Sequence, residues 1–190
     1  ETTGTAIIGR AALAAVRDDL SLPEVRSVAE WKLFSKIAEA GVSWEEPGFG
    51  WTPKFCREVD MTKERPKFLS RATPSALPLV EGRMVQAHRF GVKGHVSGTG
   101  RSALWETFPI GGSRLSPQFW ILPSDMPRAN QHRADVLRVG FCDIAGQTNE
   151  RSLMASLIPA GVVCGNKVPT ILFPDDPSEE RLLVWVSIAN

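Results

Sequence analysis

The sequence contains few of the residues that build disulfide frameworks, metal centres or membrane segments. Its 190 residues include three cysteines, three histidines and no tyrosine. The cysteines, Cys56, Cys142 and Cys164, are odd in number and form no close pair, which indicates reduced thiols in a cytoplasmic protein and argues against disulfides or a zinc site. No apolar run reaches transmembrane length and no signal-peptide pattern is present, so we expect no membrane partner.

The motifs of common enzymes are also missing. None of the histidines has the H-E-x-x-H spacing of a metalloprotease, and no G-x-S-x-G nucleophile motif occurs. The loop 91–102 approaches the phosphate-binding pattern G-x-x-x-x-G-K-[ST], but Arg101 replaces the lysine and poor helix formers follow, so we interpret it as a flexible loop. We therefore predict no catalytic and no metal-binding residue; an unrelated hydrolase that uses Cys164 or His95 is the alternative.

Charge gives no general argument for a nucleic-acid partner, because the formal net charge is only +1. Its distribution is uneven, however. Between Gly82 and Gly140, eight basic side chains stand against three acidic ones, a net charge of +5, whereas the rest of the chain has a net charge of −4. A basic middle between acidic ends is what a one-sided phosphate-binding surface requires, so this distribution is compatible with DNA contact.

Two helices are predicted from their end signals. Apolar residues make up 43% of the chain, which is enough for a core. Ser21 as N-cap, Pro23 in the first turn and Gly41 as the stop predict a helix over residues 24–40. The phrase D-P-S-E at residues 176–179 predicts the start of another.

Strands are predicted by apolar runs that are bounded by turn residues. In the first of them, residues 137–144, Leu137, Val139 and Phe141 fall on one face of an extended chain. Further strands are expected at residues 84–90, 117–122, 152–158 and 162–164. These elements together predict an α+β fold with a mixed or mainly antiparallel sheet and a few helices.

Two turns near the last strands carry polar and basic side chains, namely Asn149, Glu150, Arg151, Asn166 and Lys167. Loops held by a rigid scaffold are where binding residues tend to lie. Ordinary solvated turns have the same composition, so the residues alone leave both interpretations open.

The region around these turns contains two phrases with a fixed order. Residues 140–159 read G-F-C-D-I-A-G-Q-T-N-E-R-S-L-M-A-S-L-I-P, and residues 163–169 read V-C-G-N-K-V-P. They resemble the phrases F-R-D-I-x-x-x-T-[DN]-E-R-[ST]-x-I-A-x-[LV]-[LI]-P and V-G-[HN]-K-[LV]-P of adenine-specific DNA methyltransferases from restriction-modification and phage-defence systems. Cys142 stands where that family has arginine, so any DNA contact made by that arginine is in question here.

Two earlier patches extend the resemblance in the same order. Residues 51–63 resemble W-x-x-x-F-x-x-x-x-D-M-[ST]-[NK], with matches at Trp51, Phe55, Asp60, Met61 and Thr62. Residues 77–84 resemble L-P-L-Y-E-G-K-M, with valine in place of tyrosine and Arg83 in place of lysine. For the aromatic residues, core packing is the alternative interpretation.

The catalytic motifs of the family are absent from this chain. An adenine methyltransferase flips its target base out of the duplex and holds the amine with an [NDS]-P-P-[YF] loop. The chain has no Pro-Pro pair and no F-x-G-x-G cofactor loop. We therefore expect no cofactor in this fragment; S-adenosylmethionine would bind to an upstream catalytic domain of the parent chain, which could also carry a nuclease.

The resemblance implies a non-catalytic, C-terminal target-recognition region of a Type IIG-like enzyme, with double-stranded DNA and the upstream catalytic domain as partners. We expect a helical and aromatic connector at residues 1–76 and a sheet-rich, target-recognition-like segment at 77–190. The start at Glu1 and the abrupt end at Asn190 suggest a fragment. The predicted DNA contacts are Arg83, Arg89, Lys93, Arg101, Asn149, Arg151, Asn166 and Lys167.

A different class of function is also compatible with the sequence. The chain could be a protein-interaction module that docks the methyltransferase to a partner of the defence system. That hypothesis predicts exposed apolar surface at Trp44, Phe49 and Trp51, and no salt-dependent affinity for DNA.

Overall fold

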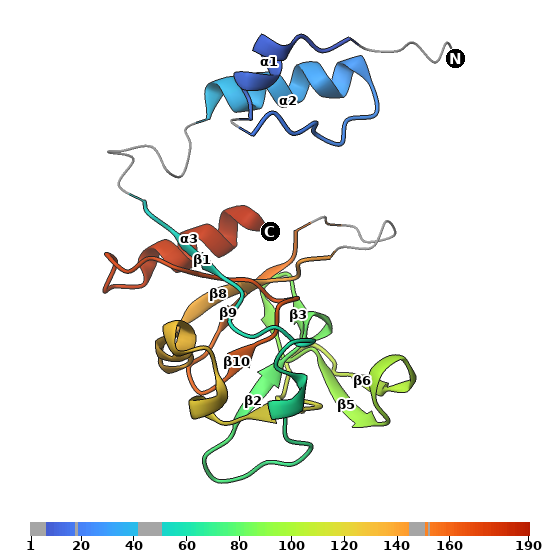
Figure 1. Cartoon of the computed structure of the whole chain (residues 1–190), viewed down its shortest axis with the longest axis vertical. Coiled ribbons are helices and arrows are strands. Elements are labelled where there is room, and N and C mark those ends of the chain that lie inside the picture. Colours follow the sequence, from blue (N-terminus) through green and yellow to red (C-terminus); the bar gives the residue numbers. More distant parts are fainter. Residues whose placement is uncertain (1–6, 18, 42–50, 145–150, 152) are drawn as a thin grey trace. The chain divides into compact units, whose positions relative to one another are not determined.

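The structure is a computed structural model, and it describes residues 7–17, 19–41, 51–144, 151 and 153–190. The chain divides into two compact units, Glu1–Gly50 and Trp51–Asn190. The smaller unit contains α1 (Arg10–Ala14) and α2 (Val28–Ala40), and the larger one contains the strands and α3 (Glu180–Ala189) (Figure 1). The fold is α+β, as predicted. No helix in these ranges has the length and apolar character to cross a membrane.

The helix predicted over residues 24–40 is present but starts later, at Val28. Its N-cap is Ser27, whose hydroxyl accepts the backbone N–H of Glu30 at 3.1 Å. A serine followed three residues later by glutamate satisfies the free N–H groups of the first turn, which fixes the start here and not at the S-L-P-E phrase. The N–H of Gly41 closes the last turn, which confirms the predicted stop.

The larger unit is built from short strands. In chain order they are β1 (Lys54–Cys56), β2 (Leu77–Val80), β3 (Val85–Gln86), β4 (Arg89–Phe90), β5 (Lys93–Ser97), β6 (Leu104–Thr107), β7 (Trp120–Ile121), β8 (Arg138–Phe141), β9 (Ala155–Ile158), β10 (Val163–Cys164) and β11 (Thr170–Leu172). Short 3₁₀ helices lie at Arg65–Lys67, Gly82–Met84, Gly100–Ser102, Pro123–Asp125 and Arg128–Asp135.

Within the described residues, these strands form two sheets and two hairpins. One sheet has the order β1-β11-β8-β9, the other has the order β10-β2-β7, and β3-β4 and β5-β6 pair as hairpins. The β10–β2 pair is parallel, whereas the other strand pairs are antiparallel. Because β1 precedes residue 77 and joins the first sheet, residues 51–76 belong to the same compact unit as the later strands.

The strand β2 lies at the centre of its sheet and is buried on both faces. Successive side chains of a strand point to opposite sides, so Leu79 packs with Ile121 while Val80 packs with Ile158. A strand buried on both faces requires a continuous apolar run, and L-P-L-V is such a run. β2 is therefore a fixed point from which the next residues of the chain project.

Helix α3 covers the sheet that contains β8 and β9 (Figure 1). Its Leu182 and Val186 share a core with Val139, which confirms the inward face predicted for the strand at residues 137–144. The D-P-S-E phrase directly precedes this helix, as predicted, but the N-cap position is Glu179 and not Asp176. The Asp176 carboxylate still accepts the backbone N–H of Arg181, in the first turn, at 2.7 Å.

The single strand predicted at residues 84–90 is wrong. The segment forms the hairpin β3–β4, in which Val85 pairs with Phe90. His88 adopts a positive φ of 58°, and its backbone N–H donates to the carbonyl of Ala155 at 2.8 Å. The chain reverses here because this tertiary hydrogen bond holds His88 in the left-handed region. No turn motif in the sequence predicts this reversal.

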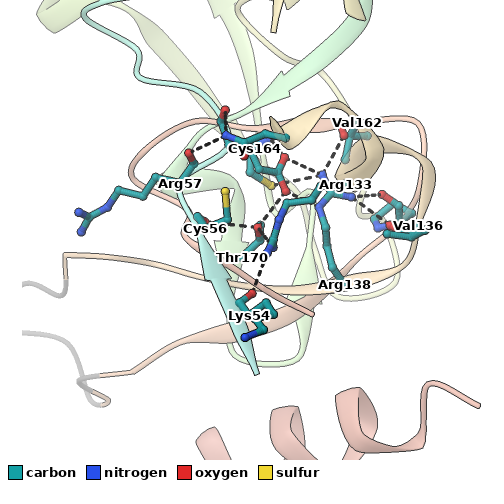
Figure 2. Close-up of polar contacts among 12 residues, drawn as sticks. Lys54, Cys56, Arg57, Arg133, Val136, Arg138, Val162, Cys164 and Thr170 are labelled. Carbon is teal, nitrogen blue, oxygen red and sulfur yellow. Dashed lines mark hydrogen bonds and ion pairs between the residues drawn. The ribbon is translucent and has the colours of Figure 1, made fainter. Parts of the chain in front are cut away.

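A fully buried ion pair ties β8 to the segment after β1. Arg138 and Glu58 have side chains with 0% exposure, and their closest atoms, Nε and Oε1, lie 2.5 Å apart. The same carboxylate accepts the Cys164 N–H at 2.8 Å and the Thr170 hydroxyl at 2.9 Å. Figure 2 shows Arg138, Cys164 and Thr170 close together in this cluster. Both carboxylate oxygens are fully satisfied, so the cluster holds the fold together and offers no free group to a ligand.

Candidate functional site

The larger unit contains an open cavity of about 530 Å³. Three of the basic residues predicted to contact DNA, namely Arg83, Lys93 and Lys167, line this one cavity although they come from separate parts of the sequence. The complete lining is Met61, Glu81, Gly82, Arg83, Val85, Gln86, Lys93, Trp105, Cys142, Ile144, Met154 and Lys167.

The first wall is the turn that leaves β2. The carbonyl of Val80 accepts the backbone N–H of Gly165 at 3.0 Å, which fixes the turn at residues 165–167 beside it. A Cβ atom on Gly82 would lie 3.2 Å from the carbonyl oxygen of Lys167 and 3.5 Å from the Cys142 sulfur. The absence of that atom allows residues 81–83 and residues 165–167 to approach closely at the cavity, with Cys142 beside Gly82.

Met61 forms a second wall. Residue 59 of the same segment pairs with Gly165 in an isolated parallel bridge. A Cβ atom on Gly165 would lie 2.6 Å from the Met61 sulfur, so the glycine leaves the space that Met61 occupies. The Asn166 side-chain oxygen accepts the Met61 backbone N–H at 3.4 Å. The segments around residues 61, 82 and 166, which lie far apart in the sequence, therefore converge on the cavity.

The hairpin β5–β6 supplies the third wall. Lys93 pairs with Thr107 and His95 with Trp105, and since alternate residues of a strand share a face, all four side chains lie on one side of the hairpin. The His95 and Trp105 rings meet edge-on with centroids 5.5 Å apart. The guanidinium of Arg83 lies over the Trp105 ring, 4.7 Å from its centroid, as a cation–π contact.

Glu81 is the most unusual residue of the cavity. Its side chain is only 12% exposed, and its nearest cation is Arg83, with 3.9 Å between Oε2 and Nε. Burial raises the pKa of this carboxyl, and the charges of Arg83, His95 and Arg65 only partly oppose that effect. Among the described residues, Glu81 Oε1 and Trp105 Nε1 are buried polar atoms without a hydrogen-bond partner. A buried polar atom left unpaired costs about 1–3 kcal/mol.

The cations of the cavity are unequally compensated. Lys167 is 51% exposed, and its ammonium lies 3.9 Å from a carboxylate oxygen of Asp143. Arg57 contacts the other oxygen of Asp143 at 3.0 Å. Within the described part of the chain, Lys93 forms no ion pair. The cavity therefore has a surplus of positive charge next to a poorly solvated carboxyl.

Of the other predicted contact residues, Arg89, Arg151 and Asn166 are described and do not line the cavity. Arg89 donates to the carbonyls of Phe108 and Pro109 at 3.2 and 3.0 Å, so its guanidinium holds the segment after β6 in place. Arg151 is exposed to solvent. Arg101 lies on the 3₁₀ helix at Gly100–Ser102, and Asn149 lies outside the described residues.

The basic stretch between Gly82 and Gly140 is not one surface, contrary to the expectation from charge counting. Arg133 and Arg138 are buried. Arg114 pairs with Glu106 at 2.6 Å. A linear count of charges cannot separate such residues from solvent-facing ones.

The structure also bears on the hydrolase alternative. Cys164 is completely buried, and this burial raises the pKa of its thiol, so a thiolate nucleophile does not form there. The Nε2 atom of His95 is 2.7 Å from the carbonyl of Gly98, a hydrogen bond that fixes the ring. In the described ranges no group of three or more His, Cys, Asp or Glu residues has the geometry of a metal site.

Sequence reasoning missed Glu81, Trp105 and Met154 as residues of the site. For Glu81 a signal existed, because it directly follows the buried run of β2 and so had to lie at a strand end. For Trp105 there was none, since its orientation is fixed only by pairing with His95 across the hairpin. Met154 lies just before β9, in a segment whose only sequence signal is its apolar character.

Comparison with known proteins adds no assignment: no protein-family model matches the sequence, and no curated protein matches it. The resemblance to adenine-specific DNA methyltransferases therefore stays a prediction that depends on the four sequence patches.

Proposed function

We propose that the chain is a non-catalytic DNA-binding and specificity module of an adenine-specific DNA methyltransferase, in a cytoplasmic restriction-modification or phage-defence system. The observation that supports this proposal is that Arg83, Lys93 and Lys167 line one cavity. These cations come from three separate segments, and two of those segments belong to the patches that resemble the family. An upstream domain of the parent chain would bind S-adenosylmethionine and transfer the methyl group.

In this role the cavity rim contacts the phosphate backbone of double-stranded DNA. Lysine and arginine side chains that meet phosphates set the orientation and register of a protein on the duplex but carry no sequence information directly. Lys93 and Lys167 are the principal candidates, and exposed Arg151 is a further one. Arg89 and Asn166 act by holding the neighbouring loops, because their side chains already have partners in the protein.

The salt dependence of DNA binding tests this assignment. Removal of one cation that touches a phosphate lowers the slope of log affinity against log salt by about 0.9 for B-DNA. We expect Lys93→Ala and Lys167→Ala to weaken binding of duplexes of any sequence and to lower this slope by roughly that amount each. Lys54→Ala, which removes an exposed lysine that does not line the cavity, is the matched control. An unchanged slope in both variants would overturn the phosphate assignment.

Methyl transfer by the parent protein tests the wider proposal. Labelled methyl groups from S-adenosylmethionine are followed onto duplex DNA, with the parent protein and with a version that lacks this chain. We expect the parent to methylate, and the deletion to lose site selection or activity. If the parent protein transfers no methyl group to any DNA, the result would favour the alternative hypothesis of a protein-interaction module.

One observation favours that second candidate. Helix α2 carries the exposed apolar residues Val28, Leu33 and Ile37. Of the aromatic residues first considered for such a surface, Trp51 packs edge-on against Phe173, and residues 44 and 49 lie outside the described ranges. A docking role predicts that Leu33→Glu abolishes capture of a partner while leaving DNA affinity unchanged.

A further inference from the structure

We propose that the cavity binds a single nucleotide, with the base against Trp105 and the phosphate between Lys93 and Lys167. This inference deepens the proposed function and rests on it for the source of the ligand, an unstacked nucleotide of DNA. A free nucleotide has the same chemistry and is the other source to be distinguished. The inference goes beyond phosphate contact at the rim, since it places a base inside the protein.

The walls of the cavity suit a flat heteroaromatic ring. Trp105 provides a ring face, and Met61 and Met154 provide flexible apolar surface. Any base can stack on an aromatic side chain, and a guanidinium can stack on the same face. The Arg83 guanidinium now lies over Trp105 at 4.7 Å, so a base and this guanidinium compete for one position.

Movement of Arg83 would also uncover the two unpaired polar atoms. Glu81 Oε1 and Trp105 Nε1 are buried, so a ligand reaches them only when a neighbouring side chain moves. Arg83 can move at low cost because its side chain is 45% exposed and its contact with Glu81 is long, 3.9 Å. A base edge carries both N–H donors and ring acceptors, which are the partners that a carboxyl and an indole N–H lack here.

Cationic side chains of the cavity would bind the phosphate group of the nucleotide. Lys93 has no ion pair among the described residues, and Lys167 is held only at 3.9 Å by Asp143. Arg83, once displaced from the indole, adds a guanidinium that can bind two phosphate oxygens. Three cations against one carboxyl disfavour a metal ion, and a bare phosphate would leave the apolar walls and Glu81 unused. The volume of about 530 Å³ lies within the roughly 300–1,000 Å³ range of ligand pockets.

The test is a titration of the full-length protein with deoxynucleoside monophosphates, the matching deoxynucleosides, inorganic phosphate, a perfect duplex and a duplex with one unpaired nucleotide. We expect the monophosphate to bind more tightly than the nucleoside or phosphate alone. Trp105→Leu should weaken that binding roughly 5- to 150-fold, the usual effect of removing the partner of one stacked base. Trp105→Phe should retain most of it, and Glu81→Gln should change the preference among bases. Trp31→Phe and Lys54→Ala, whose residues do not line the cavity, are the controls.

The outcomes separate this inference from the proposed function. Tighter binding of the duplex with the unpaired nucleotide, sensitive to Trp105→Leu, supports DNA as the source. Monophosphate binding without duplex binding supports the pocket and removes the proposed DNA function. Duplex binding that depends on the lysines but is unaffected by Trp105→Leu would overturn the nucleotide pocket and leave the DNA function intact. Equal affinity for phosphate and monophosphate would also overturn it.

Discussion

Two of the glutamate–arginine pairs among the described residues differ in how completely they are satisfied. Glu58 and Arg138 are completely buried, and each oxygen of the Glu58 carboxylate accepts two hydrogen bonds. Glu81 is nearly buried, but its contact to Arg83 is 3.9 Å long and its second oxygen has no partner among the described residues. The first pair is closed, in the sense that it is fully buried and all its carboxylate hydrogen bonds are made. The second pair is open, because it faces a cavity and one carboxylate oxygen has no partner in the described part of the chain.

The difference shows how the same two residue types can serve structure or binding. A buried ion pair with all its hydrogen bonds made is costly to disturb, because removal of one partner leaves the other charge buried and uncompensated. A buried carboxyl that lacks partners destabilises the free protein and is satisfied only by a new contact. We therefore treat Glu58–Arg138 as a clasp and Glu81–Arg83 as part of a site.

The largest effect should come from breaking the clasp. Glu58→Ala leaves the Arg138 guanidinium buried without its counterion, and we expect the free energy of unfolding to fall by about 3–5 kcal/mol. Chemical denaturation of the variant measures this change. A decrease below about 1 kcal/mol, the usual value of an exposed pair, would show that the clasp is not closed in solution.

The next largest effect compares packing in the core, at Gly140, with packing at the cavity wall, at Gly165. A Cβ atom on Gly140 would lie 2.7 Å from Ile158 and 2.9 Å from Val168, both fully buried, so Gly140→Ala should cost about 1–3 kcal/mol through overpacking. Gly165→Ala meets the flexible side chain of Met61 and should cost less. Equal decreases of unfolding free energy in the two variants would show that the cavity wall is as rigid as the core.

A smaller effect concerns pH. Burial raises the pKa of Glu81 above its ordinary value of 4.5, so the folded state holds this proton more tightly than the unfolded state. The contribution of Glu81 to stability therefore falls as pH rises from 4.5 through the raised pKa. Glu81→Gln should gain stability relative to the unmutated chain as pH rises above 4.5, measured by denaturation at each pH.

Asp176→Asn is the control of opposite sign. Hydrogen bonds from the Ser178 hydroxyl and the Arg181 N–H lower the pKa of Asp176. Its contribution is present above its ordinary value of 3.8 and is lost as pH falls through the lowered pKa. If Glu81→Gln showed the pH trend of Asp176→Asn, the carboxyl of Glu81 would not be the desolvated group described above.

The smallest effect should come from the exposed pair beside the cavity. Arg57 contacts Asp143 at 3.0 Å but is 60% exposed, so Arg57→Ala should cost about 0–1 kcal/mol and the cost should shrink in high salt. Denaturation at low and high salt measures this. A cost comparable to that of Glu58→Ala would erase the distinction between closed and open pairs.

The sequence predicted correctly those features that depend on interactions between residues close together in the chain. The stop of α2 at Gly41 and the inward face of Val139 followed from a helix-end signal and from alternation. It failed at His88, where a contact with β9 bends the chain, and at Arg138, whose charge looked like surface but lies in the core. No local pattern indicates that residue 138 pairs with residue 58, because the partner is 80 positions away.

By itself, therefore, the sequence determined the α+β class and the stop of α2 at Gly41, and it singled out three cations that the fold brings to one cavity. The tertiary structure decided which charges reach solvent and which carboxyl lacks a partner. The physical reason is that periodicity and capping act within a few residues, whereas desolvation and ion pairing depend on what the fold places against each side chain. The partner of Glu58 is 80 positions away and that of Glu81 only two, and their surroundings make one pair a clasp and the other part of a candidate site.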